Sequence, residues 1–173
     1  IETGNGPTST GDFLAMLSSA LMVRMQDTIN DTEDYVDSIE EELVSSSSYD
    51  LRNKISAVRR VVISLRRYLA PQRDALQQMN QTKVSWLTES DRQNLREVTD
   101  TLTRYIEDLD SARDRAAVAQ EELSNRLAEQ MNNRMYLLSI VAAVFLPLGF
   151  LPGLLGINVG GMPGAENPWA FWI

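Results

Sequence analysis

The sequence predicts an all-α fold: a long helical hairpin, followed by a very long stalk helix that continues into a transmembrane helix. Three observations predict it. Residues 135–158 form an uncharged, largely apolar run, close to the roughly 20 residues that a helix needs to cross a bilayer. Elsewhere, apolar residues recur every three or four positions, as on one face of a helix. No segment alternates polar and apolar residues as a half-buried strand does.

The first predicted helix follows a linker-like stretch, 1–11, and covers about thirty residues. Asp12 is the expected capping residue. Apolar residues continue at helical spacing from Phe13 through Leu17 and Leu21 to Leu43. The second half is acidic, which suits either a solvated face or an attractor for cations. The serine run 45–48 ends the helix.

The second predicted helix, 49–81, is basic in its middle. Because a short loop joins it to the acidic helix, the two are expected to form an antiparallel hairpin with complementary faces. A short connection, 83–87, follows, and Trp86 is its expected packing anchor.

The third predicted helix starts near Thr88, where Thr88 or Ser90 can cap it, and no stop signal precedes the apolar run. An apolar, heptad-like pattern extends from Leu95 to Leu123 over about four heptads and narrows to alanine in its middle. A helix of this length needs packing partners, so we expect an oligomer.

Composition excludes several functions. A net charge of −8 argues against nucleic acid as a partner, because phosphate binding needs clustered Lys and Arg. With no Cys and no His, neither a disulfide framework nor a closed zinc site is expected. No nucleophile–base pair or phosphate-binding glycine loop is present, so we expect neither an enzyme nor a bound cofactor.

Charge asymmetry around the apolar run predicts its orientation. Arg126 and Arg134 precede it, whereas the loop 159–168 has no Lys or Arg and one acid, Glu166. The positive-inside rule therefore places the helical part in the cytoplasm. Five segments result: the end of a cytoplasmic domain, 1–87; the stalk, 88–134; a first transmembrane helix, 135–158; an outer loop, 159–168; and the start of a truncated second transmembrane helix, 169–173.

The apolar run ends in Gly156-Ile157-Asn158. One asparagine oxygen is a poor metal ligand, but a ring of Asn158 side chains around a symmetry axis could hold the water shell of a hydrated cation. Divalent ions give up their water reluctantly, which makes such a ring chemically reasonable. Glu166 would concentrate cations outside it. The alternative interpretation is a Gly/Asn helix cap followed by a turn.

A long helix that leads into a span ending in Gly-x-Asn, then a short acidic loop and a new apolar segment, resembles the CorA superfamily of divalent-cation transporters. The typical signature of that superfamily is Gly-Met-Asn. Here Ile157 stands in place of the Met, as in the ZntB zinc-transporter branch. The loop Met162-Pro163-Gly164 also departs from Met-Pro-Glu, with its acid at Glu166. The stretches 3–7 and 69–73 are similar to that branch as well.

The resemblance implies a homopentamer in the bacterial inner membrane, multi-pass in the full-length protein, with zinc as the transported ion. Gly156, Ile157 and Asn158 would form the selectivity filter, and Asn158 would bind the hydrated ion. Arg126 and Arg134 would form a basic collar. The residues that match the pore lining and gate are Asn132, Met135, Leu138, Ala142, Phe145 and Gly149.

Two alternatives remain open. A magnesium, cobalt or nickel channel of the CorA type would share the predicted architecture and differ in the transported ion. A membrane-anchored coiled-coil protein for signalling or scaffolding would explain the heptads, but it leaves the Gly-Ile-Asn end without a role. Each pore-face residue could equally contact lipid or a neighbouring helix.

Overall fold

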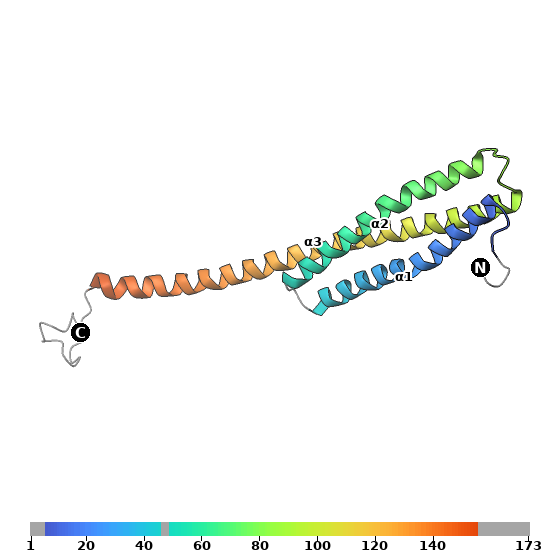
Figure 1. The fold of residues 1–173 in the computed structure, drawn as a ribbon. Coiled ribbons are helices and arrows are strands. Elements are labelled where there is room, and N and C mark those ends of the chain that lie inside the picture. Colours follow the sequence, from blue (N-terminus) through green and yellow to red (C-terminus); the bar gives the residue numbers. More distant parts are fainter. Residues whose placement is uncertain (1–5, 46–48, 156–173) are drawn as a thin grey trace, which may run out of the picture. The chain divides into compact units, whose positions relative to one another are not determined.

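The computed structural model describes residues 6–45 and 49–155, which form three helices and no strand. Helix α1 covers Thr10–Ser45, α2 covers Tyr49–Gln81, and α3 covers Glu89–Leu155 (Figure 1). The predicted all-α fold is therefore confirmed, with a helical hairpin and a very long third helix. Pro147 and Pro152 lie inside α3, so the helix continues through both prolines.

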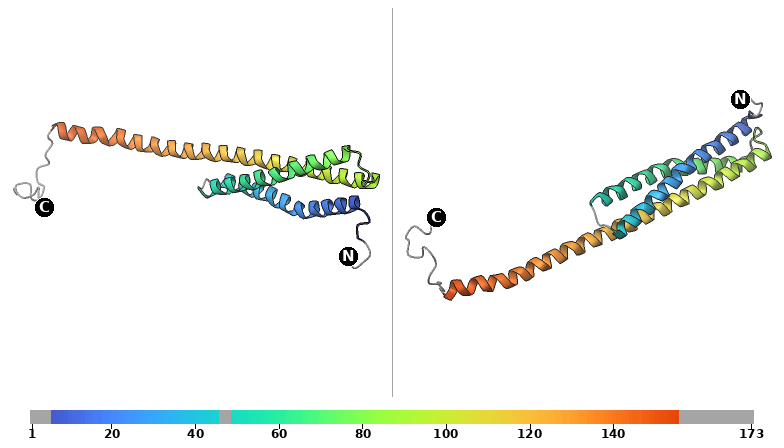
Figure 2. Two further views of the ribbon diagram at one scale, coloured as in Figure 1. Left: turned by 45° about the horizontal axis from the view of Figure 1, so that its top comes forward. Right: turned by 90° about the horizontal axis from the view of Figure 1, so that it is seen from below.

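Two compact units divide the chain, residues 1–127 and 128–173. In the first unit, α1, α2 and the beginning of α3 lie side by side (Figures 1 and 2). We call this unit the three-helix bundle. The second unit begins with the remaining part of α3, and it is described separately below.

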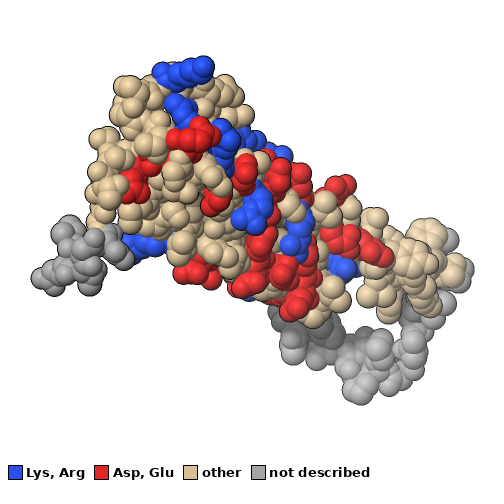
Figure 3. Space-filling view, turned by 90° about the vertical axis from the view of Figure 1, so that its right-hand side faces the viewer, with Lys and Arg blue, Asp and Glu red and all other residues tan. Residues whose placement is uncertain are grey.

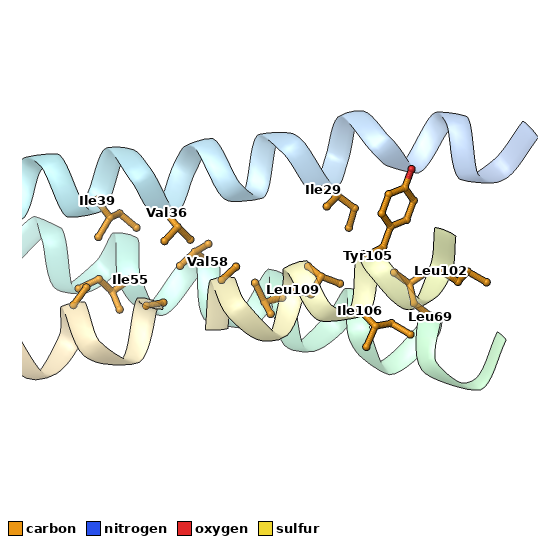
Figure 4. Packing of buried hydrophobic residues seen from close by; sticks show 14 of the residues in the cluster. Ile29, Val36, Ile39, Ile55, Val58, Leu69, Leu102, Tyr105, Ile106 and Leu109 are labelled. Carbon is orange, nitrogen blue, oxygen red and sulfur yellow. The ribbon is translucent and has the colours of Figure 1, made fainter. Parts of the chain in front are cut away.

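A heptad pattern on each helix builds the core of the three-helix bundle. Along α1, buried residues stand seven positions apart at Met22, Ile29, Val36 and Leu43, which is nearly two full turns. Side chains from all three helices meet in this core (Figure 4). The fully buried large side chains of α2 and α3 are Leu51, Ile55, Val58, Val62, Leu69, Leu95, Leu102, Leu109 and Leu123.

The spacing of apolar residues predicts the first half of α1 as a helix, which is confirmed, but it does not identify the face that is buried. Phe13, Leu17 and Leu21 are about half exposed, and the residues that face the core there are Ala15 and Met22. This part of α1 has apolar residues on more than one face, so three- and four-residue spacing fits several faces equally well. The strict seven-residue repeat selects the right one, because it continues without a break into Ile29 and beyond.

Two capping predictions have different outcomes. Asp12 is not the cap of α1: the Ser9 hydroxyl accepts a hydrogen bond from the Asp12 amide at 3.1 Å, and the Asp12 carboxylate accepts one from the Thr8 amide at 2.8 Å. Thr88 does cap α3, because its hydroxyl accepts a hydrogen bond from the Asp91 amide at 3.2 Å. Asp91 in turn accepts one from the Thr88 amide at 2.9 Å.

The packing anchor of the connection between α2 and α3 is Leu87 rather than Trp86. Leu87 is 6% exposed and joins Ala15 and Leu95 in a second apolar cluster, whereas Trp86 is 41% exposed. The Trp86 backbone still matters, because its carbonyl lies against Gly11 of α1. The predicted anchor was thus one residue away from the buried position.

Charge pairing runs largely through α3, which refines the predicted complementary hairpin. Lys54 of α2 does pair with Glu42 of α1, Nζ to Oε2 at 2.5 Å. However, Arg66 of α2 pairs with Asp110 of α3 at 2.7 Å, and Arg115 of α3 pairs with both Asp37 and Glu40 of α1. The acidic face of α1 and the basic face of α2 therefore each form ion pairs with α3 as well as with each other.

Candidate membrane helix and pore face

Within the described part of the chain, α3 contains the one segment that is long and apolar enough to cross a membrane. Every residue from 128 to 152 is exposed, and none of the most apolar window is buried against this chain. Large side chains such as Leu138 and Phe145 are more than 60% exposed. A helix that is apolar all round and uncovered needs lipid or other protein around it.

One polar side chain inside this segment has its hydrogen bond within the helix. The Ser139 hydroxyl donates a hydrogen bond to the Met135 carbonyl one turn earlier, at 2.9 Å. Back-bonding of this kind removes the cost of carrying a hydroxyl into an apolar medium. The Ser139 hydroxyl is therefore compatible with a hydrocarbon environment.

The predicted pore face has the geometry of a single helical stripe. Met135, Leu138, Ala142, Phe145 and Gly149 follow one another at three and four residues within continuous α-helix, which places them on one face. Asn132 lies one turn before Met135. All six are exposed, but so are the residues on every other face of the segment. Exposure alone therefore does not distinguish a pore face from a lipid face.

The two predicted collar arginines have different surroundings. The Arg126 guanidinium pairs with Glu122, Nε to Oε1 at 2.6 Å, and donates a hydrogen bond to the Leu43 carbonyl at 2.5 Å. Leu43 lies in the last turn of α1, whose free carbonyls favour a cation. Arg134 is exposed and makes no salt bridge within the described residues. The structure thus gives Arg126 a contact in the bundle, whereas Arg134 remains accessible.

The predicted filter residues Gly156, Ile157 and Asn158, together with Glu166, lie outside the described residues. Their roles as selectivity ring and cation attractor remain predictions. Pore lining by the six residues named above also remains a prediction, and so does the basic collar, because a single chain contains no ring.

Part of the acidic half of α1 is engaged in ion pairs, since Asp37 and Glu40 pair with Arg115 and Glu42 pairs with Lys54. No group of three or more acidic side chains among the described residues is placed to hold a metal ion. Hydrogen bonds to Glu40 and Asp37 raise the pKa of the Arg115 guanidinium. Burial raises the pKa of Glu33, and the carboxylates of Asp108 and Asp37 raise it further. Figure 3 shows acidic and basic side chains interleaved over one face of the molecule.

Sequence reasoning missed three residues that shape the bundle. Arg115 connects α3 to the acidic face of α1, and Gly11 and Asp91 bring the N-terminal ends of α1 and α3 together. A signal for Arg115 was present, since it stands one residue before the core position Ala116. Nothing local marks Gly11, because its role depends on a contact with a residue eighty positions away.

Comparison with known proteins identifies the family. The family described as "CorA-like Mg2+ transporter protein" matches residues 1–173, the whole chain. The chain belongs to the CorA-like family. This is a family of ion transporters rather than enzymes, and its members are membrane proteins, in agreement with the candidate membrane helix in α3.

Individual CorA-like relatives are similar over the full chain. The divalent cation transporter CmaX of Pseudomonas aeruginosa is 42% identical over 175 residues, which cover 100% of this chain and 52% of the relative. The zinc transport protein ZntB of Pectobacterium atrosepticum is 36% identical over 172 residues, covering 99% and 52%. The chain therefore spans about half the length of the curated relatives it matches.

Solved structures agree with the CorA-like fold. The structure of full-length CmaX superposes with a TM-score of 0.82 and 40% identity, covering 99% of this chain and 53% of the other. The CorA magnesium transporter of Methanocaldococcus jannaschii superposes with a TM-score of 0.77 and 21% identity, covering 94% and 51%. The second match supports the fold alone.

Proposed function

We propose that the parent protein transports divalent metal cations, with zinc as its cargo, through the central pore of a homopentamer in the bacterial inner membrane. The observation that carries the proposal is the CorA-like family match over the whole chain, together with an apolar helix left uncovered by its own chain. An uncovered helix of this kind fits a site between several copies and lipid.

In this proposal the six-residue face from Asn132 to Gly149 lines the pore, and the bundle lies on the cytoplasmic side. Met135 and Leu138 form an apolar constriction at the inner end, which gates by dewetting. Arg134 belongs to the basic collar, and Arg126 contributes to it from the edge of the bundle. Gly156, Ile157 and Asn158 form the outer filter, which binds a hydrated ion through the Asn158 amide oxygen and backbone carbonyls.

The choice of zinc is supported by the ZntB relatives and by the Gly-Ile-Asn sequence. Magnesium is the second candidate, because the family itself is described as a Mg2+ transporter and CmaX is named for no particular ion. No described residue prefers zinc by its own chemistry, since the chain has neither Cys nor His.

The test is metal flux into liposomes by the full-length parent protein, with zinc and magnesium compared and Asn158→Ala set beside wild type. Asn133→Ala is the matched control, because it removes the same amide next to the proposed pore face. Zinc flux that collapses in Asn158→Ala and persists in Asn133→Ala is expected. Magnesium flux with little zinc flux would mean that magnesium is the transported ion. No flux of either ion would favour a membrane-anchored coiled coil.

A further inference from the structure

Two helices of the bundle carry opposite charge on their outer faces. Helix α1 has nine acidic residues and one arginine, whereas α2 has seven basic residues and two acidic ones. The ion pairs described above use only the sides of α1 and α2 that face each other or α3. The charged side chains on the outer faces of α1 and α2 are therefore available to pair with a partner of opposite charge.

The outermost acids of α1 are Asp27, Asp34 and Glu41, which we call the acidic stripe. Each precedes a buried core residue by two positions, so it points about 200° away from the core at roughly 100° per residue. All three are exposed and make no salt bridge within the described residues. The stripe therefore runs straight along the back of α1, with one acid every two turns.

Helix α2 repeats this arrangement with the opposite sign. Arg60 and Arg67, which we call the arginine pair, stand two positions before the buried residues Val62 and Leu69. Both are exposed, and neither forms a salt bridge within the described residues. The Arg67 guanidinium lies over the Tyr68 ring, 5.1 Å from its centroid, which holds it at the surface. Exposed apolar side chains flank the pair at Val61, Ile63 and Tyr68.

The stripe and the pair also match in height along the bundle. Helices α1 and α2 are antiparallel, and Lys54 lies opposite Glu42. Arg60 stands six residues after Lys54 on α2, and Val36 stands six residues before Glu42 on α1, so these two residues are at about the same height. Asp34 is two residues, or roughly 3 Å, beyond Val36. Another seven residues along each helix bring Arg67 to the level of Ile29, again about two residues from Asp27. Rotation about an axis along the bundle keeps every residue at its own height, so this match carries over to a neighbouring copy.

We propose that Arg60 and Arg67 of one copy bind Asp34 and Asp27 of the next copy, so that α2 of each subunit packs against α1 of its neighbour. This interface rests on the proposed homo-oligomer. If α3 faces the central axis, α1 and α2 occupy the two outer corners of each bundle, so the α1 corner of one copy comes next to the α2 corner of the following copy, within reach of long arginine side chains. An interface between different faces of identical subunits closes into a ring in this way. Paired charges fix its register and orientation more than its strength.

The first test is disulfide cross-linking of the full-length parent protein, which exploits the absence of cysteine from this chain. The double variant Asp34→Cys/Arg60→Cys is expected to give a ladder of covalent oligomers on a non-reducing gel. Asp34→Cys/Asp74→Cys is the matched control. Asp74 lies on the same outer stripe of α2, fourteen residues or roughly 21 Å from Arg60, so that variant is expected to remain monomeric on the gel.

The second test is a charge exchange read out by native mass spectrometry in detergent. Asp34→Arg and Arg60→Asp are each expected to reduce the oligomeric fraction, and the combined variant is expected to restore it. An intact oligomer with no ladder and no restoration would overturn this interface and leave the proposed oligomeric transporter standing. A wild-type protein that is monomeric by native mass spectrometry, together with a double variant that gives no ladder, would overturn both. The ladder does not depend on metal flux, so the cargo assignment is tested separately.

Discussion

Gly11 lies where the N-terminal ends of α1 and α3 meet, and it shows how much depends on one missing methyl group. A Cβ at this position would lie 2.4 Å from Asp91 Oδ2 and 3.1 Å from the Trp86 carbonyl oxygen. The Asp91 carboxylate is not free to move, because it is buried and accepts the Thr88 amide hydrogen bond. Relief of the clash would therefore open the cap of α3.

We predict that Gly11→Ala destabilises the bundle by about 1–3 kcal/mol, the usual cost of overpacking. Urea unfolding followed by circular dichroism measures the change. Gly6→Ala is the matched control, since a Cβ there meets nothing within 4 Å. Equal stability of the two variants would mean that α1 and α3 do not meet as closely as described.

Glu33 is a second residue for which the effect of pH on the stability of the bundle can be given a direction. Burial and the facing carboxylates of Asp108 and Asp37 raise its pKa above the ordinary carboxyl range. Because the folded pKa is raised, the folded state binds this proton more tightly than the unfolded chain does. Its contribution to stability is therefore full below the unfolded pKa and is lost as pH rises through the folded pKa.

Glu33→Gln should consequently stabilise the bundle at neutral pH, by less than about 1 kcal/mol because Glu33 is partly exposed and screened. The advantage should disappear in acid, where Glu33 is protonated in both states. Denaturant titrations at several pH values provide the measurement. Asp108→Asn should reduce the gain from Glu33→Gln, and a gain of the same size in that background would contradict the assigned cause.

At the scale of elements, the end of α1 depends on a residue from another helix. The last turn of α1 contains no basic residue and follows three consecutive acids, 40–42, which oppose the helix dipole. Arg126 of α3 compensates for this by donating to the Leu43 carbonyl while pairing with Glu122. A prediction of a basic collar from sequence could not include this contact, because α1 and Arg126 meet only in the folded bundle.

We predict that Arg126→Ala lowers the free energy of unfolding of the bundle by about 1 kcal/mol, since it removes a charged hydrogen bond that is partly exposed to solvent. Arg134→Ala is the matched control and should leave this stability unchanged, because Arg134 has no salt bridge in the described residues. If both variants changed flux and neither changed stability, the collar would be the main role of Arg126.

The elements differ in how far sequence could predict them. The bounds of α2 and the cap at Thr88 are confirmed, since a basic amphipathic pattern and a Thr-x-x-Asp start are local signals. The core face of early α1 does not follow from three- and four-residue spacing, because Phe13, Leu17 and Leu21 are apolar yet exposed. Only the strict heptad through Met22 and Ile29 distinguishes the two faces. The pore face remains a prediction, because it depends on copies of the chain that the sequence does not specify.

At the scale of the whole molecule, the chain combines two units that need different surroundings. All the residues of the apolar core cluster lie between Met22 and Leu123, within the bundle. The apolar segment of α3 that follows contributes nothing to that core and is exposed throughout. Folding of the bundle in water should therefore not require the membrane segment, whereas the membrane segment requires a different environment.

We predict that a fragment of residues 1–127 is soluble without detergent, is helical and unfolds in one cooperative transition. The chain of residues 1–173 should need detergent, because its apolar helix would otherwise associate through exposed leucine, valine and phenylalanine side chains. Light scattering and thermal unfolding by circular dichroism compare the two. A fragment 1–127 that aggregates or melts without cooperativity would show that the exposed Phe13, Leu17 and Leu21 need a cover from elsewhere in the parent protein. In that case the heptad core alone would be too small to stabilise the bundle.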